Sequence, residues 1–477
     1  MTFTDIAPAS AEIFMAIAAL VLLVAGVVRG DRSLRLLTWA VVGVMVLALA
    51  AVWCTAAPDA QIIFNGLFVA DRFALFTKTI LLLGAILALL MGGAYAERHM
   101  QRFEYPILIL LTTLGTLLMV SANDMLSLYV GLELQSLALY ILAAFRRDDL
   151  KSSEAGLKYF VLGALSSGIL LFGISLLYGI TGTTNFDQLH NAATLGSPVV
   201  LVGIVFVLAG LAFKISAVPF HMWVPDVYEG APTAVTAFFA AVPKVAAFAL
   251  LLRVMFVPFE TLFNAWQMLA VIMAVASMLI GAFAALKQTN IKRLMAYSSI
   301  GHVGYALVGV AAGGQEGISS VLLYLAIYYL MTIGTFAVIL VMRRDGKQVE
   351  NLEDLAGLGK SHPVLALAMA ALMFSMAGVP PLAGFFGKFY VFMAALNAGL
   401  VVLAVLGVLL SAVSAYYYMR IIKIMYFDDA TSGALDRVPE LQVRFVLGIS
   451  AAFIVLFTFM PSPLIDAAGR AAQSLLS

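Results

Sequence analysis

The chain has 477 residues, of which 63% are hydrophobic and 11% are charged, and its mean hydropathy is +1.04. Soluble domains are about half apolar and about a quarter charged, so a soluble fold could not cover this much apolar surface. The 27 lysines and arginines nearly balance the 26 acids, and Cys54 is the single cysteine. This composition argues against a nucleic-acid-binding protein, and one cysteine excludes an internal disulfide framework and a CxxC motif.

Apolar stretches of membrane-spanning length follow one another along nearly the whole chain. A helix needs about 20 predominantly apolar residues to cross the hydrocarbon core of a bilayer. The sequence therefore predicts an all-α integral membrane protein with about fourteen transmembrane helices. The expected spans are residues 11–29, 34–54, 73–95, 105–122, 124–145, 155–180, 198–217, 232–257, 265–287, 291–312, 317–342, 364–395, 398–427 and 443–463.

The distribution of cationic residues between the connections predicts the orientation of the chain. Arg29, Arg32 and Arg35 lie in the first connection, and nearly all other lysines and arginines outside the spans fall on the same side of the membrane. Only Arg72 and Arg470 fall on the opposite side. The positive-inside rule then places the first connection in the cytoplasm and both termini outside. The first ten residues contain no lysine or arginine, so we expect no cleaved signal peptide.

Some charged residues fall within the predicted spans, where a charge at mid-bilayer costs about 2.5–3.5 kcal/mol on insertion scales. Lys78 and Arg253 lie near the outer ends of their spans, so we expect their long side chains to snorkel to the headgroups. Lys158 lies a few residues into its span and follows Glu154 by four positions, which is also the spacing of an ordinary helical ion pair. Its role stays open between an accessory proton site and a static pair.

One acid and three lysines lie deeper. Glu133 is placed near the middle of the fifth span, and Lys214, Lys244 and Lys388 lie in the seventh, eighth and twelfth spans. One carboxylate cannot neutralise three ammonium groups, so some of these amines are expected to be neutral part of the time or solvated by internal water. Lysine can lose its proton under such conditions and arginine cannot, so we expect proton transfer. A static ion pair between Glu133 and Lys214 is the alternative.

Two apolar segments are too long for one straight crossing. Residues 198–230 contain Pro219, and residues 364–395 contain Pro380 and Pro381. Proline removes a backbone donor, and the freed carbonyls are tolerated in a membrane only where protein or water satisfies them. We therefore expect two broken helices that line a cavity, with a simple proline kink as the alternative for each.

The two expected breaks lie five helices apart, in helices that run in opposite directions, as in the inverted repeats of ion-coupled transporters. We therefore divide the chain into four parts. These are an N-terminal three-helix segment (1–104), a first inverted repeat of helices four to eight (105–257), a second inverted repeat of helices nine to thirteen (265–427), and a C-terminal loop with helix fourteen (428–477).

Weaker signals lie near both breaks. His302 begins a glycine-rich stretch of the tenth span, and His221 follows Pro219. Histidine can relay protons near neutral pH, but a lone intramembrane histidine is also often an interhelical hydrogen bonder. Asp226 and Glu229 lie in the polar turn after the first break, where we expect solvated loop charges, with a contact to a partner as the alternative.

Five segments, in this order, resemble one known family. They are GLELQSLALYILAAF (131–145), GLKYFVLGALSSG (156–168), FKISAVPFHMWVPDVYEGAPTAV (213–235), LKQTNIKRLMAYSSIGHVGY (286–305) and AGVPPLAGFFGKFYVF (377–392). They look like the antiporter-like proton-pumping subunits of respiratory complex I, the NADH:quinone oxidoreductase, and the similarity spans almost the whole chain. The length, the lysine in the second broken helix and the lack of a long lateral helix favour the subunit N branch, whose mitochondrial counterpart is NADH dehydrogenase subunit 2.

The resemblance implies a multi-pass protein of the bacterial inner membrane with both termini in the periplasm. Its partners would be the lipid bilayer and the other membrane-arm subunits of complex I. Flavin, iron–sulfur clusters and quinone are expected on other subunits, with no cofactor or metal in this chain. The functional residues of the family map to Glu133, Lys214, Lys244 and Lys388, with Lys158 as an accessory.

The expected function is proton translocation that is coupled to quinone reduction elsewhere in the complex. Protons are expected to load Lys244 from the cytoplasm near the first broken helix and to leave through Lys388, while Glu133 tunes Lys214. Three alternatives stay open. They are a subunit of a multi-subunit cation/proton antiporter, a stand-alone transporter for a small organic solute, and a structural anchor in the membrane arm.

Overall fold

The computed structural model describes residues 6–57, 59–193, 197–430, 433, 435–436 and 440–477, and most of this described chain is helical. The helices are α2 (Ser10–Arg29), α3 (Leu34–Cys54), α4 (Arg72–His99), α5 (Glu104–Val120), α6 (Met125–Ala143), α7 (Leu150–Thr181), α8 (Phe186–Ala193), α9 (Pro198–Ile215), α10 (Val224–Gly230), α11 (Thr233–Phe256), α12 (Phe263–Leu286), α13 (Ile291–Ala312), α14 (Gly314–Val341), α15 (Leu358–Ser361), α16 (Pro363–Ala377), α17 (Ala383–Asn397), α18 (Val401–Phe427), α19 (Leu441–Leu456) and α20 (Ser462–Leu476). Two antiparallel hairpins lie in the connections, β1 (Gln61–Ile63) with β2 (Phe68–Ala70) and β3 (Arg343–Arg344) with β4 (Lys347–Gln348).

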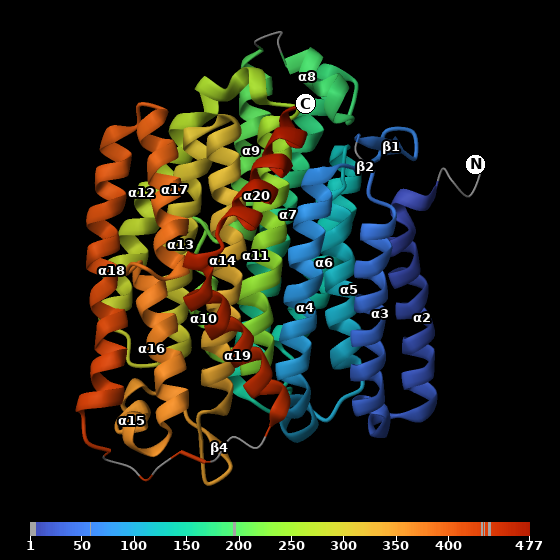
Figure 1. Cartoon of the computed structure of the whole chain (residues 1–477). Helices are drawn as coiled ribbons and strands as arrows, with labels where there is room; N and C mark the ends of the chain where they lie inside the picture. Colours follow the sequence, from blue (N-terminus) through green and yellow to red (C-terminus); the bar gives the residue numbers. More distant parts are fainter. Residues whose placement is uncertain (1–5, 58, 194–196, 431–432, 434, 437–439) are drawn as a thin grey trace.

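The helices stand side by side in one bundle (Figure 1). Within the described ranges, twelve helices are long and apolar enough to cross a membrane, and the shorter apolar helices α5 and α16 lie at two further predicted crossings. Helices α2 and α3 form one edge of the bundle, and α12 and α18 form the other. The predicted all-α, multi-pass membrane architecture is confirmed. The count of fourteen crossings, the inverted repeats and the division into four parts stay predictions.

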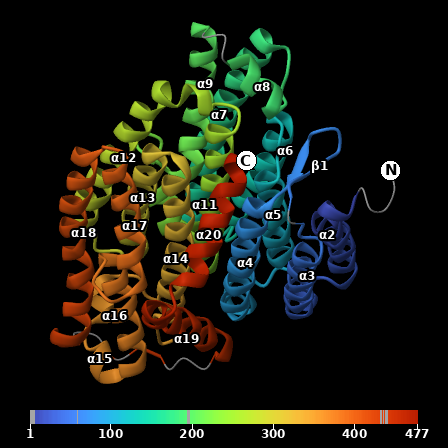
Figure 2. The same cartoon turned by 45° about the horizontal axis from the view of Figure 1, so that its top comes forward.

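Helices α11 and α14 form the centre of the bundle. The membrane-spanning stretches of both are completely buried, and that of α13 is nearly so. Helix α11 packs against α4, α5 and α14, while α14 packs against α13, α17, α19 and α20, and Figures 1 and 2 show α11 and α14 among the other helices. A helix that is buried all round has no lipid-facing side, so the polar groups that it carries meet protein or internal water.

Side-chain caps determine where two important helices begin. The Asp124 carboxylate accepts a hydrogen bond from the Leu126 backbone N–H at 2.7 Å, at the start of α6. The Asn290 side chain accepts one from the Arg293 N–H at 3.1 Å, at the start of α13. Such caps satisfy backbone donors that have no partner within the helix. They fix the first turns of two helices that carry much of the site described below.

The first predicted broken helix is confirmed. Helix α9 ends at Ile215, and Ser216 adopts a left-handed backbone conformation with φ of 68°. The chain then passes through a cis Val218–Pro219 peptide bond before α10 begins. The helix is interrupted here rather than bent, so the alternative of a simple proline kink is wrong for this segment.

The second predicted break is also a full interruption. Helix α16 ends at Ala377, Gly378 has φ of 88°, and the next turn contains a cis Pro380–Pro381 bond before α17 begins. A Cβ atom on Gly384 would lie only 1.9 Å from the Ser375 carbonyl oxygen. The start of α17 therefore approaches the end of α16 at a distance that only glycine permits.

Helix α20 is an element that the sequence did not reveal. The expected last span ends shortly after Pro461, but the structure continues from there into a second helix that packs against α4 and α14. This helix buries Ala468 and Ala472 and exposes Asp466 and Arg470. Because these charges interrupt the apolar run, the hydropathy pattern does not detect the helix.

Two charges that were expected to snorkel are buried in ion pairs instead. Lys78 Nζ lies 2.5 Å from Glu12 Oε1, and the two side chains are 4% and 3% exposed. Arg253 donates from its two terminal nitrogens to the Asp71 carboxylate at 2.9 Å each, and its Nε donates to the Val120 carbonyl oxygen at 2.8 Å. The prediction was wrong because an acid on a neighbouring segment provides a closer partner for each cation than a headgroup does.

Candidate functional site

The first deep lysine lies beside helix α6. Lys214 occupies the last turn of α9, directly before the first break, and its side chain is buried. Its Nζ donates a hydrogen bond to Ser136 Oγ at 2.8 Å and lies 3.5 Å from the Tyr140 hydroxyl oxygen. Both partners belong to α6 and both are neutral, so no direct contact compensates a positive charge on this amine.

Glu133 lies on the same helix but is not paired with Lys214. Its half-buried carboxylate accepts a hydrogen bond from Ser167 Oγ of α7 at 2.5 Å. Among the residues that the structure describes, no ion pair joins Glu133 to Lys214. The static pair considered from the sequence is therefore not formed in this structure, and each of the two side chains has its own serine partner.

The second deep lysine projects from the wholly buried helix α11. Lys244 Nζ donates to Ser299 Oγ of α13, and this hydroxyl also accepts a hydrogen bond from the Tyr328 hydroxyl of α14 at 2.9 Å. The Tyr228 ring lies 5.4 Å from the amine, within the range of a cation–π contact. Within the described part of the chain, Lys244 has no carboxylate partner.

His302 connects three helices through two tyrosines. Its Nδ1 lies 2.5 Å from the Tyr324 hydroxyl of α14, and its Nε2 lies 2.9 Å from the Tyr418 hydroxyl of α18. The Tyr418 hydroxyl is also hydrogen-bonded to Ser298. A neutral imidazole has one donor nitrogen and one acceptor nitrogen, which matches two hydroxyl partners. The interhelical hydrogen bonds of a structural histidine are thus present, and the relay role stays a prediction.

The third deep lysine depends on the second break. Lys388 lies on α17, but its amine reaches back to the end of α16 and donates to the carbonyl oxygens of Met376 and Ala377 at 2.9 and 3.0 Å. It also donates to Ser411 Oγ of α18 at 2.8 Å and lies 4.8 Å from the Tyr305 ring. The last carbonyls of a helix lack intrahelical partners and form the negative end of its dipole. The break therefore creates the binding site of this amine.

Helix α13 joins the surroundings of two of the lysines. Its Ser299 contacts Lys244, its His302 follows one turn later, and its Tyr305 lies beside Lys388. Residues of α13 therefore contact both Lys244 and Lys388, and His302 lies between these two contacts along the helix. Lys214 and Glu133 form a separate cluster, and among the described site residues no hydrogen bond joins Lys214 to Lys244.

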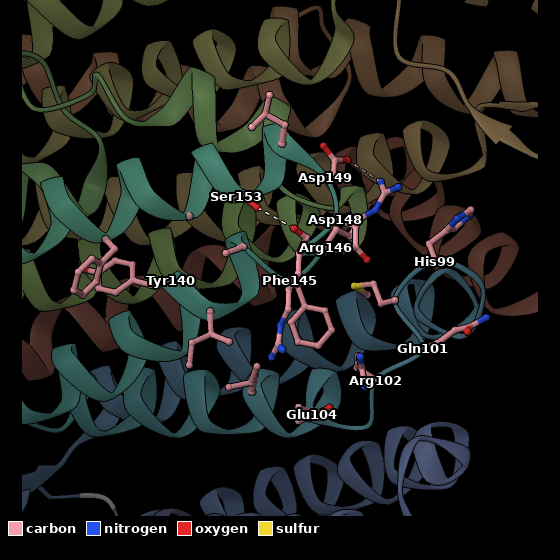
Figure 3. A pocket seen from close by; sticks show the side chains of 18 of the residues that line it. His99, Gln101, Arg102, Glu104, Tyr140, Phe145, Arg146, Asp148, Asp149 and Ser153 are labelled. Carbon is pink, nitrogen blue, oxygen red and sulfur yellow. Dashed lines mark hydrogen bonds and ion pairs between the residues drawn. The ribbon is translucent and has the colours of Figure 1, made fainter.

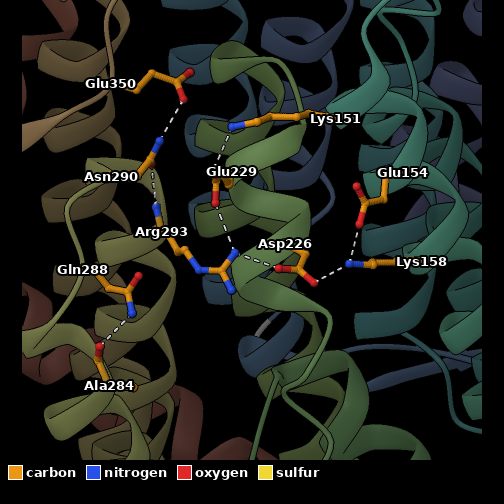
Figure 4. A network of polar contacts seen from close by, with 10 residues as sticks. All are labelled: Lys151, Glu154, Lys158, Asp226, Glu229, Ala284, Gln288, Asn290, Arg293 and Glu350. Atoms are coloured by element: carbon orange, nitrogen blue, oxygen red, sulfur yellow. Dashed lines mark hydrogen bonds and ion pairs between the residues drawn. The ribbon is translucent and has the colours of Figure 1, made fainter.

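A network of ion pairs holds α10, the second half of the first broken helix (Figure 4). Asp226 accepts from Lys158 of α7 and from Arg293 of α13, each at 2.7 Å. Glu229 accepts from Lys151 of α7 at 2.9 Å and from Arg293 at 3.1 Å. The expectation that these two acids are merely solvated was wrong, because α10 is clamped between helices from the two expected repeats.

Two lysines of this region differ in burial. Lys158 is 40% exposed and lies 2.6 Å from Glu154 and 2.7 Å from Asp226, so the helical pair that its spacing indicated is formed. Its accessory proton role stays a prediction. Lys292, at the cytoplasmic end of the tenth expected span, is buried and paired with Glu350 at 2.8 Å. No sequence pattern distinguished Lys292 from the exposed cations around it.

The α10 network changes the acidity of its carboxyl groups. Partial burial raises the pKa of Asp226, but the hydrogen bonds and charges of Lys158 and Arg293 together lower it by more, so the net pKa is below the ordinary value. The pKa of Glu229 is lowered in the same way by Lys151 and Arg293. A carboxylate of this kind stabilises the folded state above its unfolded pKa, and the stabilisation is lost as the pH falls through the folded pKa.

Asp226→Asn is expected to lower the thermal stability of the purified protein at pH 7, by about 1 kcal/mol or less because the pairs are partly exposed. The difference from the unsubstituted protein should be fully present above the unfolded pKa of about 4, and it should shrink as the pH falls below that value towards the lowered pKa of the folded carboxyl group, where the native group becomes protonated as well. Thermal unfolding curves at several pH values test this. Asp429→Asn, at an exposed acid paired with Lys360, is the control, and an equal effect of both variants would contradict the role of the network.

Comparison with known proteins identifies the family of this chain. The family model "NADH:quinone oxidoreductase/Mrp antiporter, TM" matches residues 122–414. NADH-quinone oxidoreductase subunit N from Rhodospirillum rubrum is 57% identical over 100% of this chain and 99% of that protein. The protein of the same name from Paramagnetospirillum magneticum is 55% identical over 99% of this chain and 98% of its own length. This chain belongs to the NADH-quinone oxidoreductase subunit N family.

Solved structures share the fold of this subunit N family member. A chain of respiratory complex I from Thermus thermophilus matches with a TM-score of 0.81 and 32% identity, over 96% of this chain and 98% of that one. A chain of the Mrp complex from Dietzia sp. DQ12-45-1b matches with a TM-score of 0.88 and 25% identity, over 100% of both chains. The resemblance to the antiporter-like subunits of complex I that the five sequence segments indicated is confirmed, and the relatives named subunit N confirm the branch that the length, the lysine in the second broken helix and the lack of a lateral helix favoured.

Proposed function

We propose that this subunit N family member translocates protons across the bacterial inner membrane as a non-redox subunit of NADH:quinone oxidoreductase. The observation that carries the proposal is that Lys214, Lys244 and Lys388 have buried amines whose hydrogen-bond partners are all neutral. An ammonium group without a counter-ion is costly in a medium of low dielectric constant. The protonated and neutral forms are therefore closer in free energy than in water, which suits a group that must take up and release a proton.

The relay would use the two clusters differently. Lys244 takes a proton from the cytoplasm beside the first broken helix, and hydroxyls, internal water and His302 along α13 lead the proton to Lys388. Lys388 releases it outward through the second break. Glu133 tunes Lys214 by pairing with it or leaving it, and the separate serine partners of these two side chains correspond to the released arrangement.

The drive must come from partner subunits. Moving one proton against 100 mV costs about 2.3 kcal/mol. We place flavin, iron–sulfur clusters and quinone on other subunits of the complex, and we place both termini of this chain in the periplasm. A subunit of a multi-subunit cation/proton antiporter is the second candidate, favoured by the TM-score of 0.88 with the Mrp chain.

Purification of the tagged chain in mild detergent separates the two candidates. We expect the preparation to contain the other subunits of the complex and to have NADH:quinone reductase activity. After the preparation is reconstituted in vesicles, we expect NADH to drive proton transport. Recovery of the chain with antiporter subunits and without reductase activity would support the second candidate and overturn the first.

A further inference from the structure

Two cavities of opposite character begin at the end of the bundle that carries α15 and β4 (Figure 1). One, of about 1350 Å³, is surrounded by charged side chains such as Arg102, Asp148 and Asp149 (Figure 3), which favour water. The other, of about 960 Å³, lies between α16 and α19 and is lined mainly by apolar side chains of the segments 361–371 and 443–456. We call this second cavity the α16–α19 groove.

The α16–α19 groove has about the length of one membrane leaflet. From Arg444 to Leu456 it follows about 18 Å of α19, at 1.5 Å per residue, and the hydrocarbon layer of one leaflet is about 15 Å deep. Val364 and Leu367 in one wall and Leu456 in the other are exposed, so the groove is open to its surroundings. A transmembrane helix would cover both leaflets, so this length favours an acyl chain as the occupant.

Positive charge and unsatisfied polar groups lie at one end of the groove. Arg444 belongs to the first turn of α19, and His362, at the start of α16, has a buried Nδ1 without a hydrogen-bond partner in the described protein. Both helices begin here, and the N-terminus of a helix attracts anions. Glu440, which directly precedes α19, accepts hydrogen bonds from Arg98 and Arg343, so two cations already compensate its charge.

We propose that the α16–α19 groove binds one anionic glycerophospholipid. Its phosphate accepts hydrogen bonds from Arg444 and from His362 Nδ1, and one acyl chain lies between α16 and α19. The planar guanidinium group matches a phosphate in shape and charge. In the orientation proposed above, the lipid belongs to the cytoplasmic leaflet. Gly448 and Ala452 have the spacing of small residues at helix–helix contacts, so a helix of another subunit is the occupant that the test must exclude.

Photocrosslinking from the wall of the groove identifies the occupant. Leu367 is replaced by p-benzoylphenylalanine, and Leu409, on α18 and outside the groove, is the matched control site; the native side chains are 65% and 58% exposed. The assembled complex is reconstituted with equal amounts of phosphatidylglycerol and phosphatidylcholine that carry the same acyl chains, and the masses of the adducts are measured after irradiation. At Leu367 we expect about fivefold more phosphatidylglycerol adducts, which corresponds to about 1 kcal/mol for a cationic residue near an anionic lipid. At Leu409 we expect equal amounts. Equal amounts at both positions, no lipid adducts at Leu367, or adducts there with another subunit would overturn the lipid site.

Three variants of the photoreactive protein test the two parts of the site. Arg444→Gln is expected to bring the ratio of the two adducts at position 367 close to one, whereas Arg35→Gln, at an exposed cation of α3, should leave it unchanged. Ala452→Phe narrows the groove and keeps Arg444, so we expect several-fold fewer adducts of both lipids. The NADH:quinone reductase activity of each preparation checks that the complex is assembled. An unchanged ratio in Arg444→Gln would overturn the phosphate contact, and undiminished adducts in Ala452→Phe would overturn the position of the acyl chain. Neither readout depends on proton transport, so either failure would leave the proposed function standing.

Discussion

Replacement of Lys244 by alanine is expected to abolish NADH-driven proton transport in the assembled complex, and Lys214→Ala is expected to do the same. Each substitution removes a buried amine that can hold a proton in the middle of the bundle, and the neighbouring serine hydroxyls cannot replace it as a base. Loss of a positioned acid–base group typically costs about 10²–10⁴-fold in rate. The measurement is the proton gradient formed by inverted vesicles, recorded together with the rate of quinone reduction.

Two further variants show whether the charge or its exchange is required. Arginine keeps a positive charge and does not release its proton, so Lys244→Arg is expected to transport as poorly as Lys244→Ala. Lys360→Ala, at a side chain that is 78% exposed, is expected to transport normally. Unimpaired transport in Lys214→Ala or Lys244→Ala would contradict the relay and favour the alternative that the chain is a structural anchor in the membrane arm.

The membrane-spanning helices could be predicted because the bilayer itself sets their length. An apolar run of about 20 residues must be a helix wherever it lies in the bundle, so no knowledge of tertiary contacts is required. The same holds for the breaks, where Pro219 and Pro380 lie within runs too long for one crossing. The burial of Lys214 and Lys244 inside the bundle could be predicted from their depth in the spans, because a charge at that depth is too costly to face lipid.

The partners of these lysines could not be predicted, because they depend on which helices face one another. The contacts of Lys244 with Ser299, and of His302 with Tyr324 and Tyr418, join segments far apart in the chain. Hydropathy gives the depth of each residue but not the side of the bundle on which it lies. Glu133 illustrates this limit, since it has the right depth for Lys214 but is hydrogen-bonded to a serine of α7 instead.

Depth in the membrane alone also led to a wrong prediction for the cations at the outer ends of the helices, which were expected to reach the headgroups. Lys78 and Arg253 lie where long side chains often reach the headgroups, and no sequence pattern connects them with Glu12 and Asp71. Both acids lie at the start of a helix, where an acid favours the positive end of the helix dipole and is therefore unremarkable in sequence. Only the packing of α2, α4 and α11 shows that they are counter-ions.

Arg253→Met is expected to destabilise the protein by about 3–5 kcal/mol, because it leaves the Asp71 carboxylate buried without its partner. The substitution also removes the hydrogen bond to the Val120 carbonyl oxygen. The thermal transition of the purified complex and the yield of assembled complex are the measurements. Because Lys244 lies on the same helix as Arg253, a displaced α11 should reduce proton transport as well.

A double variant separates the cost of the unpaired charge from the value of the pair. Asp71→Asn keeps an oxygen that can accept from the Ala74 N–H at the start of α4, and combined with Arg253→Met it removes both charges. The double variant is expected to recover most of the lost stability, because leaving one buried charge unpaired is the larger penalty. Arg35→Ala, at a side chain that is 77% exposed, should cost no more than about 1 kcal/mol. If Arg253→Met unfolds at the same temperature as Arg35→Ala, the buried pair does not anchor α11 to α4, and the position of Lys244 must be maintained by the apolar packing of the bundle alone.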